Sequence, residues 1–121
     1  MSRIEQINDI LRFMQSGTPD VEGCAIVSDD GLMIASAFPS HFDEGRIAGM
    51  TSTLLSLGGR TAEELERGEL EQVYVKGNHG YVIATQASEG TVFVVLTNQN
   101  AKLGLIFLDM RRCIEQIRKV L

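Results

Sequence analysis

The chain has 121 residues, of which 44% are hydrophobic, so a single domain spanning residues 1–121 can bury a core without disulfide or metal support. A net charge of −5, with no basic run to offset it, argues against nucleic acid or an anionic membrane as the main partner. The two cysteines, Cys24 and Cys113, share no metal-ligand spacing with each other or with the histidines, and we interpret them as buried free thiols.

The first segment has the pattern of a short amphipathic helix. Ser2 and Glu5 have the spacing of a capping box, and Pro19 ends the pattern because proline cannot continue a helix. Apolar residues between them recur every three or four positions: Ile4, Ile7, Leu11 and Met14. Charges interrupt the segment, so it has neither a signal peptide's apolar block nor a membrane-spanning run. We therefore expect a cytoplasmic protein.

Two short apolar runs follow, within the sequence GCAIVSDDGLMIASAF. They flank Asp29, Asp30 and Gly31, a turn-forming triplet, so we predict a β-hairpin. The first run, Cys24 to Val27, is apolar at every position, which is typical of a central strand covered on both faces. Turn chemistry explains the paired aspartates better than metal binding does, because no further ligands stand at suitable spacing.

A long helix is predicted over residues 43–68, DEGRIAGMTSTLLSLGGRTAEELERG, with Asp43 as its N-cap. One side carries large apolar residues, which we expect to pack on the chain's own sheet: Ile47, Met50, Leu54, Leu57 and Leu65. A neighbouring stripe of mostly small residues is expected to touch a second helix: Ala48, Ser52, Leu55, Gly59 and Ala62. The third side faces water or a polar partner: Arg46, Thr53, Ser56, Arg60, Glu63, Glu64 and Arg67.

Two adjacent glycines lie inside this predicted helix. Each costs about 0.5–1 kcal/mol relative to alanine, so Gly58 and Gly59 need a compensating gain. Close approach of another backbone would supply that gain. The alternative is that the glycines mark a break between two shorter helices.

Three β-rich runs follow, at residues 71–76, 81–87 and 91–97, and short glycine-bearing connections predict an antiparallel meander. The first run alternates polar and apolar side chains, which suits an edge strand or one joined to another molecule's edge. A final helix is predicted over residues 100–121, with Asn100 as a possible cap.

The predicted order is therefore α-β-β-α-β-β-β-α, an α+β three-layer sandwich built on one five-stranded antiparallel sheet. The two terminal helices share one face, and the long helix takes the other alone. One helix cannot cover five strands, so we expect the same helix of a second copy, related by a two-fold axis, to cover the rest.

Several pieces in this order resemble the Roadblock type of dynein light chain domain, and within it bacterial regulators similar to mutual gliding motility protein B. They are the strand GLMIAS, the stretch ELERGELEQVYVKG after the long helix, and the final NAKLGLIFLDMRR. The resemblance implies homodimers in which long helices and third strands pair, which adds Val73 and Val75 to the expected dimer contacts. It also implies binding of a small Ras-like GTPase, in some relatives with faster GTP hydrolysis.

The expected GTPase-facing residues come from the polar side of the long helix: Arg46, Thr53, Ser56, Arg60, Glu64 and Arg67. The resemblance assigns no catalytic side chain, and no cofactor or metal is expected. His41 and His79 lie among turn residues, and no serine has a G-x-S-x-G context, so the chain is not expected to be an enzyme. Two functions are in play, a GTPase regulator and a scaffold or tethering subunit without effect on nucleotide turnover. A small-molecule sensor is disfavoured because no polar cluster marks a ligand pocket.

Overall fold

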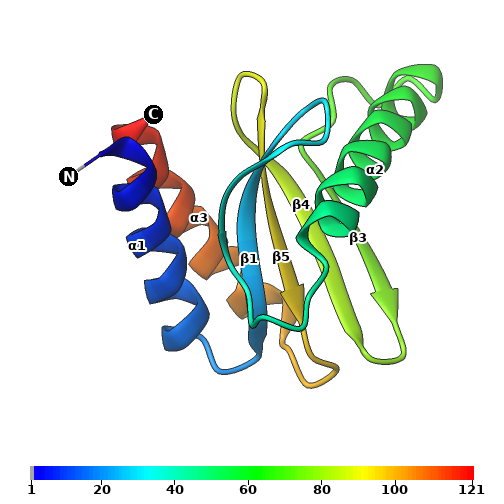
Figure 1. Cartoon of the computed structure of the whole chain (residues 1–121). Helices are drawn as coiled ribbons and strands as arrows, with labels where there is room; N and C mark the ends of the chain where they lie inside the picture. The colour runs from blue at the N-terminus through cyan, green and yellow to red at the C-terminus, as the bar shows by residue number, and fades with distance from the viewer. Residues whose placement is uncertain (1) are drawn as a thin grey trace.

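The structure, a computed structural model, describes residues 2–121 and has the predicted order of elements. The helices and strands are α1 (Arg3–Gly17), β1 (Val21–Ser28), β2 (Met33–Ala37), α2 (Glu44–Glu64), β3 (Gln72–Gly77), β4 (Gly80–Ser88), β5 (Thr91–Thr97) and α3 (Leu103–Val120). The strands form one antiparallel sheet in the order β2-β1-β5-β4-β3, with α1 and α3 on one face and α2 on the other (Figure 1). The predicted three-layer α+β sandwich is confirmed.

The helix starts follow the local capping chemistry at two of three predicted positions. The Ser2 side chain accepts a hydrogen bond from the Glu5 amide at 3.1 Å, and Asp43 accepts one from the Arg46 amide at 3.1 Å. The prediction of Asn100 as a cap is wrong. Helix α3 begins three residues later, at Leu103, because residues 98–101 form a turn closed by the backbone bond from residue 101 to residue 98.

The long helix is continuous through its two glycines, so the alternative of two shorter helices is excluded. It ends at Glu64 rather than near Gly68, because Glu66 and Gly68 adopt positive φ angles of 60° and 90°.

The main core lies between the sheet and the α1–α3 layer. Residues 7, 11 and 14 of α1 and five residues of α3 turn inward against β1, β4 and β5, and Phe93 is the largest fully buried side chain. The apolar runs of β1 and β5 are buried on both faces, as predicted for central strands. Cys24 and Cys113 are buried free thiols in this layer, which confirms that prediction.

The second core, under α2, is much smaller. It consists of Ala25, Val27, Ala48 and Val94 with a few half-buried neighbours. The helix crosses the sheet face alone (Figure 1), so a large part of that face is left without a covering layer.

Candidate protein-interaction site

The side of α2 that faces its own sheet is lined by small residues. Ala48 is 1% exposed and Thr51 is 2% exposed. A Cβ atom on Gly58 would lie 3.2 Å from Leu70 Cδ2 and 3.6 Å from Val73 Cβ. Gly58 therefore allows α2 to lie close to Leu70 and Val73 of the same chain, and this contact offsets the cost of a glycine in the helix.

The large apolar stripe of α2 packs on the chain's own sheet only in part. Ile47 is half-buried against the second core, as predicted, and Leu54 is half-buried, whereas the predicted packing is wrong for Met50, Leu57 and Leu65. Met50 is 63% exposed, Leu57 is 62% exposed and Leu65 is 65% exposed. The sequence period separates the two stripes correctly, but the small one allows the helix to lie closer to the strands. Most of the large stripe therefore faces the space beside α2 and not the strands beneath it.

Two of the expected dimer contacts on the small stripe also touch their own chain. Ala48 is covered by its own sheet, and the Ser52 hydroxyl donates a hydrogen bond of 2.7 Å to the Asp29 carbonyl in the β1–β2 turn. Leu55, Gly59 and Ala62 are half-buried. Ala48 is therefore covered by its own chain, and Ser52 holds the β1–β2 turn while staying half-buried. Contact of Ser52, Leu55, Gly59 and Ala62 with a second copy stays a prediction.

An open groove of about 530 Å³ runs beside α2, above the uncovered part of the sheet. Ile47, Met50 and Leu54 form its helical wall, and Val75, Val82 and Leu96 of β3, β4 and β5 form its floor. These lining side chains are apolar, and Val75 is 49% exposed. This groove is the site that sequence analysis missed, although its signal was present in the large apolar stripe.

The two edges of the sheet differ in protection. At the β2 edge, the side-chain oxygen of Asn8 in α1 accepts a hydrogen bond of 3.3 Å from the Ser36 amide. The Ser36 hydroxyl donates a hydrogen bond of 2.8 Å to the Glu44 carboxylate. At the β3 edge, every residue except Val73 is exposed, and within residues 2–121 no side chain bonds to the β3 backbone. Edge β3 is thus open to pairing, whereas β2 is blocked.

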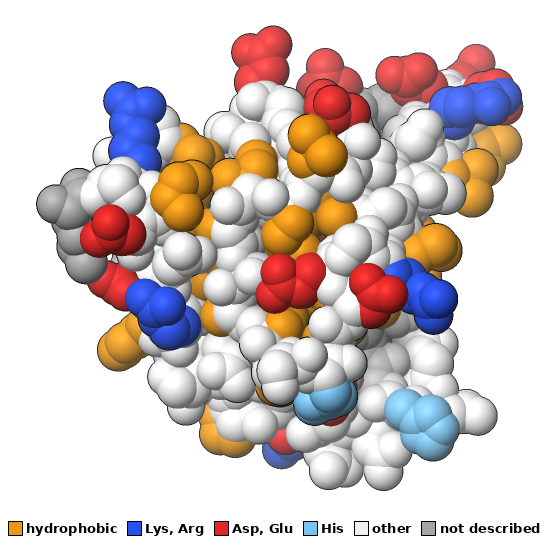
Figure 2. Space-filling model, viewed as in Figure 1, with side chains coloured by type: hydrophobic (Ala, Val, Ile, Leu, Met, Phe, Trp, Pro, Cys, Tyr) orange, Lys and Arg blue, Asp and Glu red, His pale blue; other side chains and the backbone are white. Residues whose placement is uncertain are grey.

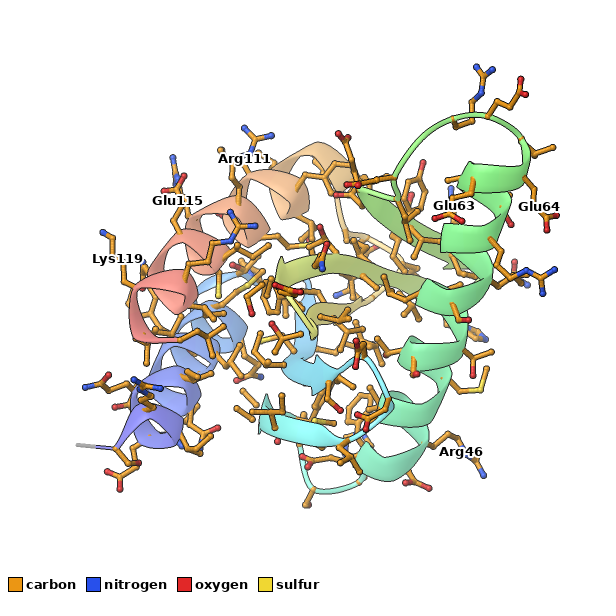
Figure 3. The ribbon with its side chains drawn as sticks, turned by 90° about the horizontal axis from the view of Figure 1, so that it is seen from above. Arg46, Glu63, Glu64, Arg111, Glu115 and Lys119 are labelled. Carbon is orange, nitrogen blue, oxygen red and sulfur yellow. The ribbon has the colours of Figure 1, made fainter. Side chains whose placement is uncertain are left out.

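The outer stripe, as we call the residues predicted to face a GTPase, comprises five residues of α2 and Arg67, which lies three residues beyond the end of the helix: Arg46, Thr53, Ser56, Arg60, Glu64 and Arg67. All six are exposed. Arg46 also lines the groove. Arg46 lies near one end of the helix and Glu64 near the other (Figure 3), and an ion pair of 3.3 Å joins Arg60 to Glu64. A surface pair of this kind contributes little to stability, so these charges are free to meet a partner.

The remaining chemistry-bearing residues do not assemble into a site within the described part of the chain. His41 and His79 are exposed, and the His41 ring packs against Phe42 with ring centres 4.6 Å apart; both histidines are visible at the surface in Figure 2. Burial raises the pKa of the Cys113 thiol to about 12 and raises that of Cys24 further, with a contribution from Cys113. Burial therefore disfavours the thiolate form of both cysteines.

Within residues 2–121, no group of three or more His, Cys, Asp or Glu side chains could hold a metal ion. No helix in that part of the chain is long and apolar enough to cross a membrane.

Comparison with known proteins identifies the family. The Roadblock/LC7 domain model matches residues 7–97. The chain belongs to the Roadblock/LC7 domain family. The uncharacterized protein MJ1340 of Methanocaldococcus jannaschii is 39% identical to this Roadblock/LC7 domain over 101 residues, which cover 84% of this chain and 88% of that one.

Two solved structures of low sequence identity have the same fold. Myxococcus xanthus MglB superposes with a TM-score of 0.87 at 19% identity, covering 97% of this chain and 88% of that one. A Roadblock/LC7 domain from Streptomyces avermitilis gives a TM-score of 0.86 at 20% identity, covering 93% and 94%. At these identities the likeness establishes the fold and the similarity to MglB expected from the sequence.

Proposed function

We propose that this Roadblock/LC7 domain is a homodimeric regulatory protein that binds a small Ras-like GTPase and stimulates its GTP hydrolysis or controls its location in the cytoplasm. Membership of the family and the structural similarity to MglB support a regulatory role. The GTPase partner follows from the resemblance to bacterial regulators of the MglB type.

The observation that carries the proposal is that the open groove and the open β3 edge lie side by side. Val75 belongs to both, since it forms part of the groove floor and stands in β3. A second copy related by a two-fold axis would place its α2 in this groove and its β3 against this β3, covering both surfaces at once. In this proposal the dimer contacts include Met50, Leu54 and Leu57 of α2 and Val73 and Val75 of β3, beside the half-buried Leu55, Gly59 and Ala62 that the sequence predicts.

Pairing of two α2 helices also creates a platform. The two outer stripes would lie next to each other on the side away from the sheet, and each contributes three arginines as well as hydroxyl groups. We propose that the GTPase binds this platform. In this proposal the regulator acts by holding a conformation of the GTPase, with no catalytic side chain, cofactor or metal of its own.

The test is a single-turnover assay of phosphate release. The purified dimer is mixed with the GTP-loaded Ras-like GTPase encoded nearest to it in the genome, and binding is measured in parallel by calorimetry. An activator binds and raises the rate of phosphate release. Binding with an unchanged rate indicates the scaffold function instead, and absence of binding to any such GTPase from the same organism contradicts the proposal.

A further inference from the structure

A second surface lies on the opposite face of the sheet, between α1 and α3. A cleft of about 230 Å³ runs between the two helices, and we call it the α1–α3 cleft. Ile10, Phe13 and Met14 of α1 line one side, and Asp109, Arg112 and Gln116 of α3 line the other. Phe13 is 76% exposed, the highest fraction among the large apolar side chains of the described residues. Phe13 stands beside the half-buried Ile10 in the same cleft, so the two side chains offer a joint apolar contact.

The size and shape of the cleft favour a protein segment over a small ligand. Small-molecule sites usually enclose ~300–1,000 Å³, so this cleft is below that range. Its lining residues recur at spacings of three and four along both helices, over about two turns of each. The sheet lies beneath the helices and offers no free strand edge here, so a third helix is the element that fits, packed in the groove between two others.

The charge of this layer selects the partner. Helices α1 and α3 carry six basic and four acidic side chains, whereas the rest of the chain carries five basic and twelve acidic ones. Asp109 already accepts a hydrogen bond from the Thr18 hydroxyl at 3.2 Å. Arg112 has no carboxylate within 4.0 Å among the described residues. The cleft thus offers a cation whose charge is not neutralised.

The outer side of α3 carries two further basic side chains and one acidic side chain. Arg111, Glu115 and Lys119 point away from the molecule along this helix (Figure 3). Acidic side chains lie instead along the upper edge in Figure 2, from the β4–β5 and β1–β2 turns to the end of α2. The basic layer also lies on the face of the sheet opposite to α2, so it remains accessible when α2 and β3 are covered by a second copy.

We infer that the α1–α3 cleft binds an acidic amphipathic helix of a partner protein, whose apolar side chains contact Phe13 and Ile10 while a carboxylate pairs with Arg112. This surface is separate from the GTPase platform, so the regulator can hold a second partner at the same time. A protein helix is favoured over an anionic membrane because the apolar residues line a hollow and Asp109 and Glu115 share the face.

The experiment uses the full chain and a fluorescein-labelled peptide of about 18 residues, with leucines at helical spacings of three and four flanked by glutamates. Fluorescence anisotropy is measured against this probe and against a copy with lysine in place of glutamate. We expect the acidic peptide to bind at least about tenfold more tightly than the lysine peptide. Phe13→Ser and Arg112→Glu should each weaken binding of the acidic peptide about tenfold, and Arg112→Glu should improve binding of the lysine peptide.

Matched controls separate this surface from general stickiness. Leu32→Ser removes an apolar side chain of similar exposure, 65%, from the β1–β2 turn, and Arg67→Glu reverses an arginine near the end of α2. Neither should change the affinity. Equal binding of both peptides, no binding of the acidic peptide, or an unchanged affinity in Arg112→Glu would overturn the inference. Phe13-dependent binding to phosphatidylserine vesicles without peptide binding would identify a membrane surface instead and would also overturn it.

Discussion

Replacement of Met50 by glutamate tests the proposed use of the open groove. Met50 is 63% exposed and lies on the groove wall, so in an isolated chain the substitution changes a largely solvated position of a helix. Glutamate has nearly the helix propensity of methionine, so α2 should still form. In the proposed dimer the same side chain is covered by the second copy, and the variant places a carboxylate in an apolar contact.

The magnitude follows from the area that remains to be covered. Complete burial of a methionine side chain contributes ~1.5–3 kcal/mol, and roughly two-thirds of that is still available at Met50, or ~1–2 kcal/mol per copy. A two-fold dimer contains the contact twice, so loss of the apolar contacts alone weakens it by ~2–4 kcal/mol. This corresponds to a ~30- to 700-fold rise in the dimer dissociation constant. Burial of the carboxylate adds to that rise.

Sedimentation velocity over a concentration series measures this constant directly, with circular dichroism to check that the variant is folded. Leu32→Glu is the matched control, because Leu32 is 65% exposed on the β1–β2 turn, outside the groove. Its dissociation constant should equal that of the unmodified protein. A Met50→Glu variant that is folded and dimerises with unchanged affinity would refute the assignment of the large apolar stripe to the interface.

Three further predictions concern the platform, the buried thiols and a turn. Reversal of the three arginines of the outer stripe to glutamate should weaken GTPase binding at least about tenfold, measured by calorimetry, and leave the dimer mass unchanged; unchanged binding would move the platform elsewhere. Burial raises the thiol pKa of Cys24 and Cys113 above 9.0, the ordinary value, so the thiols of the unfolded chain ionise first. The fold therefore keeps its full stability below pH 9.0 and loses stability as the pH rises above that value. Above that pH, each thiol lowers the free energy of unfolding, measured with urea, by up to ~1.4 kcal/mol per pH unit. This dependence on pH should be weaker in the double variant Cys24→Ala/Cys113→Ala, and an unchanged dependence would contradict the burial argument. Gly80→Ala should destabilise the fold by ~3 kcal/mol or more in the same assay. The Cβ of the new alanine would lie 1.9 Å from the Thr97 carbonyl oxygen, and Gly80 has a φ of 141°. A loss below ~1 kcal/mol would show that the turn between β3 and β4 can shift.

The order of the elements and the layers of the sandwich were predictable because each depends on local pattern. Alternation, apolar runs, Gly31 and the caps at Ser2 and Asp43 each act over a few residues, and all agree with the observed fold. The need for something to cover the α2 face was also predictable, since it follows from one helix lying over five strands.

The orientation of α2 about its own axis was not predictable from the period of its side chains. Both stripes have helical spacing, and the outcome depends on how near the helix lies to β1 and to the segment before β3. Ala48 and Gly58 allow that approach, whereas Met50 or Leu57 in the same place would hold the helix away from the strands. The α1–α3 cleft was missed for a related reason, because Phe13 and Arg112 are far apart in sequence and meet only when the two helices pack.

Hydrogen exchange at the β3 edge tests the central claim most directly, because the backbone amides of β3 that point away from β4 have no side-chain hydrogen-bond partner within the described chain. At protein concentrations well above the dimer dissociation constant, we predict that these amides exchange slowly, and that dilution or Met50→Glu makes them exchange as fast as amides in an open strand. Fast exchange of these amides at concentrations where the particle has twice the chain mass of 13.3 kDa would show that the copies meet elsewhere and would contradict the account.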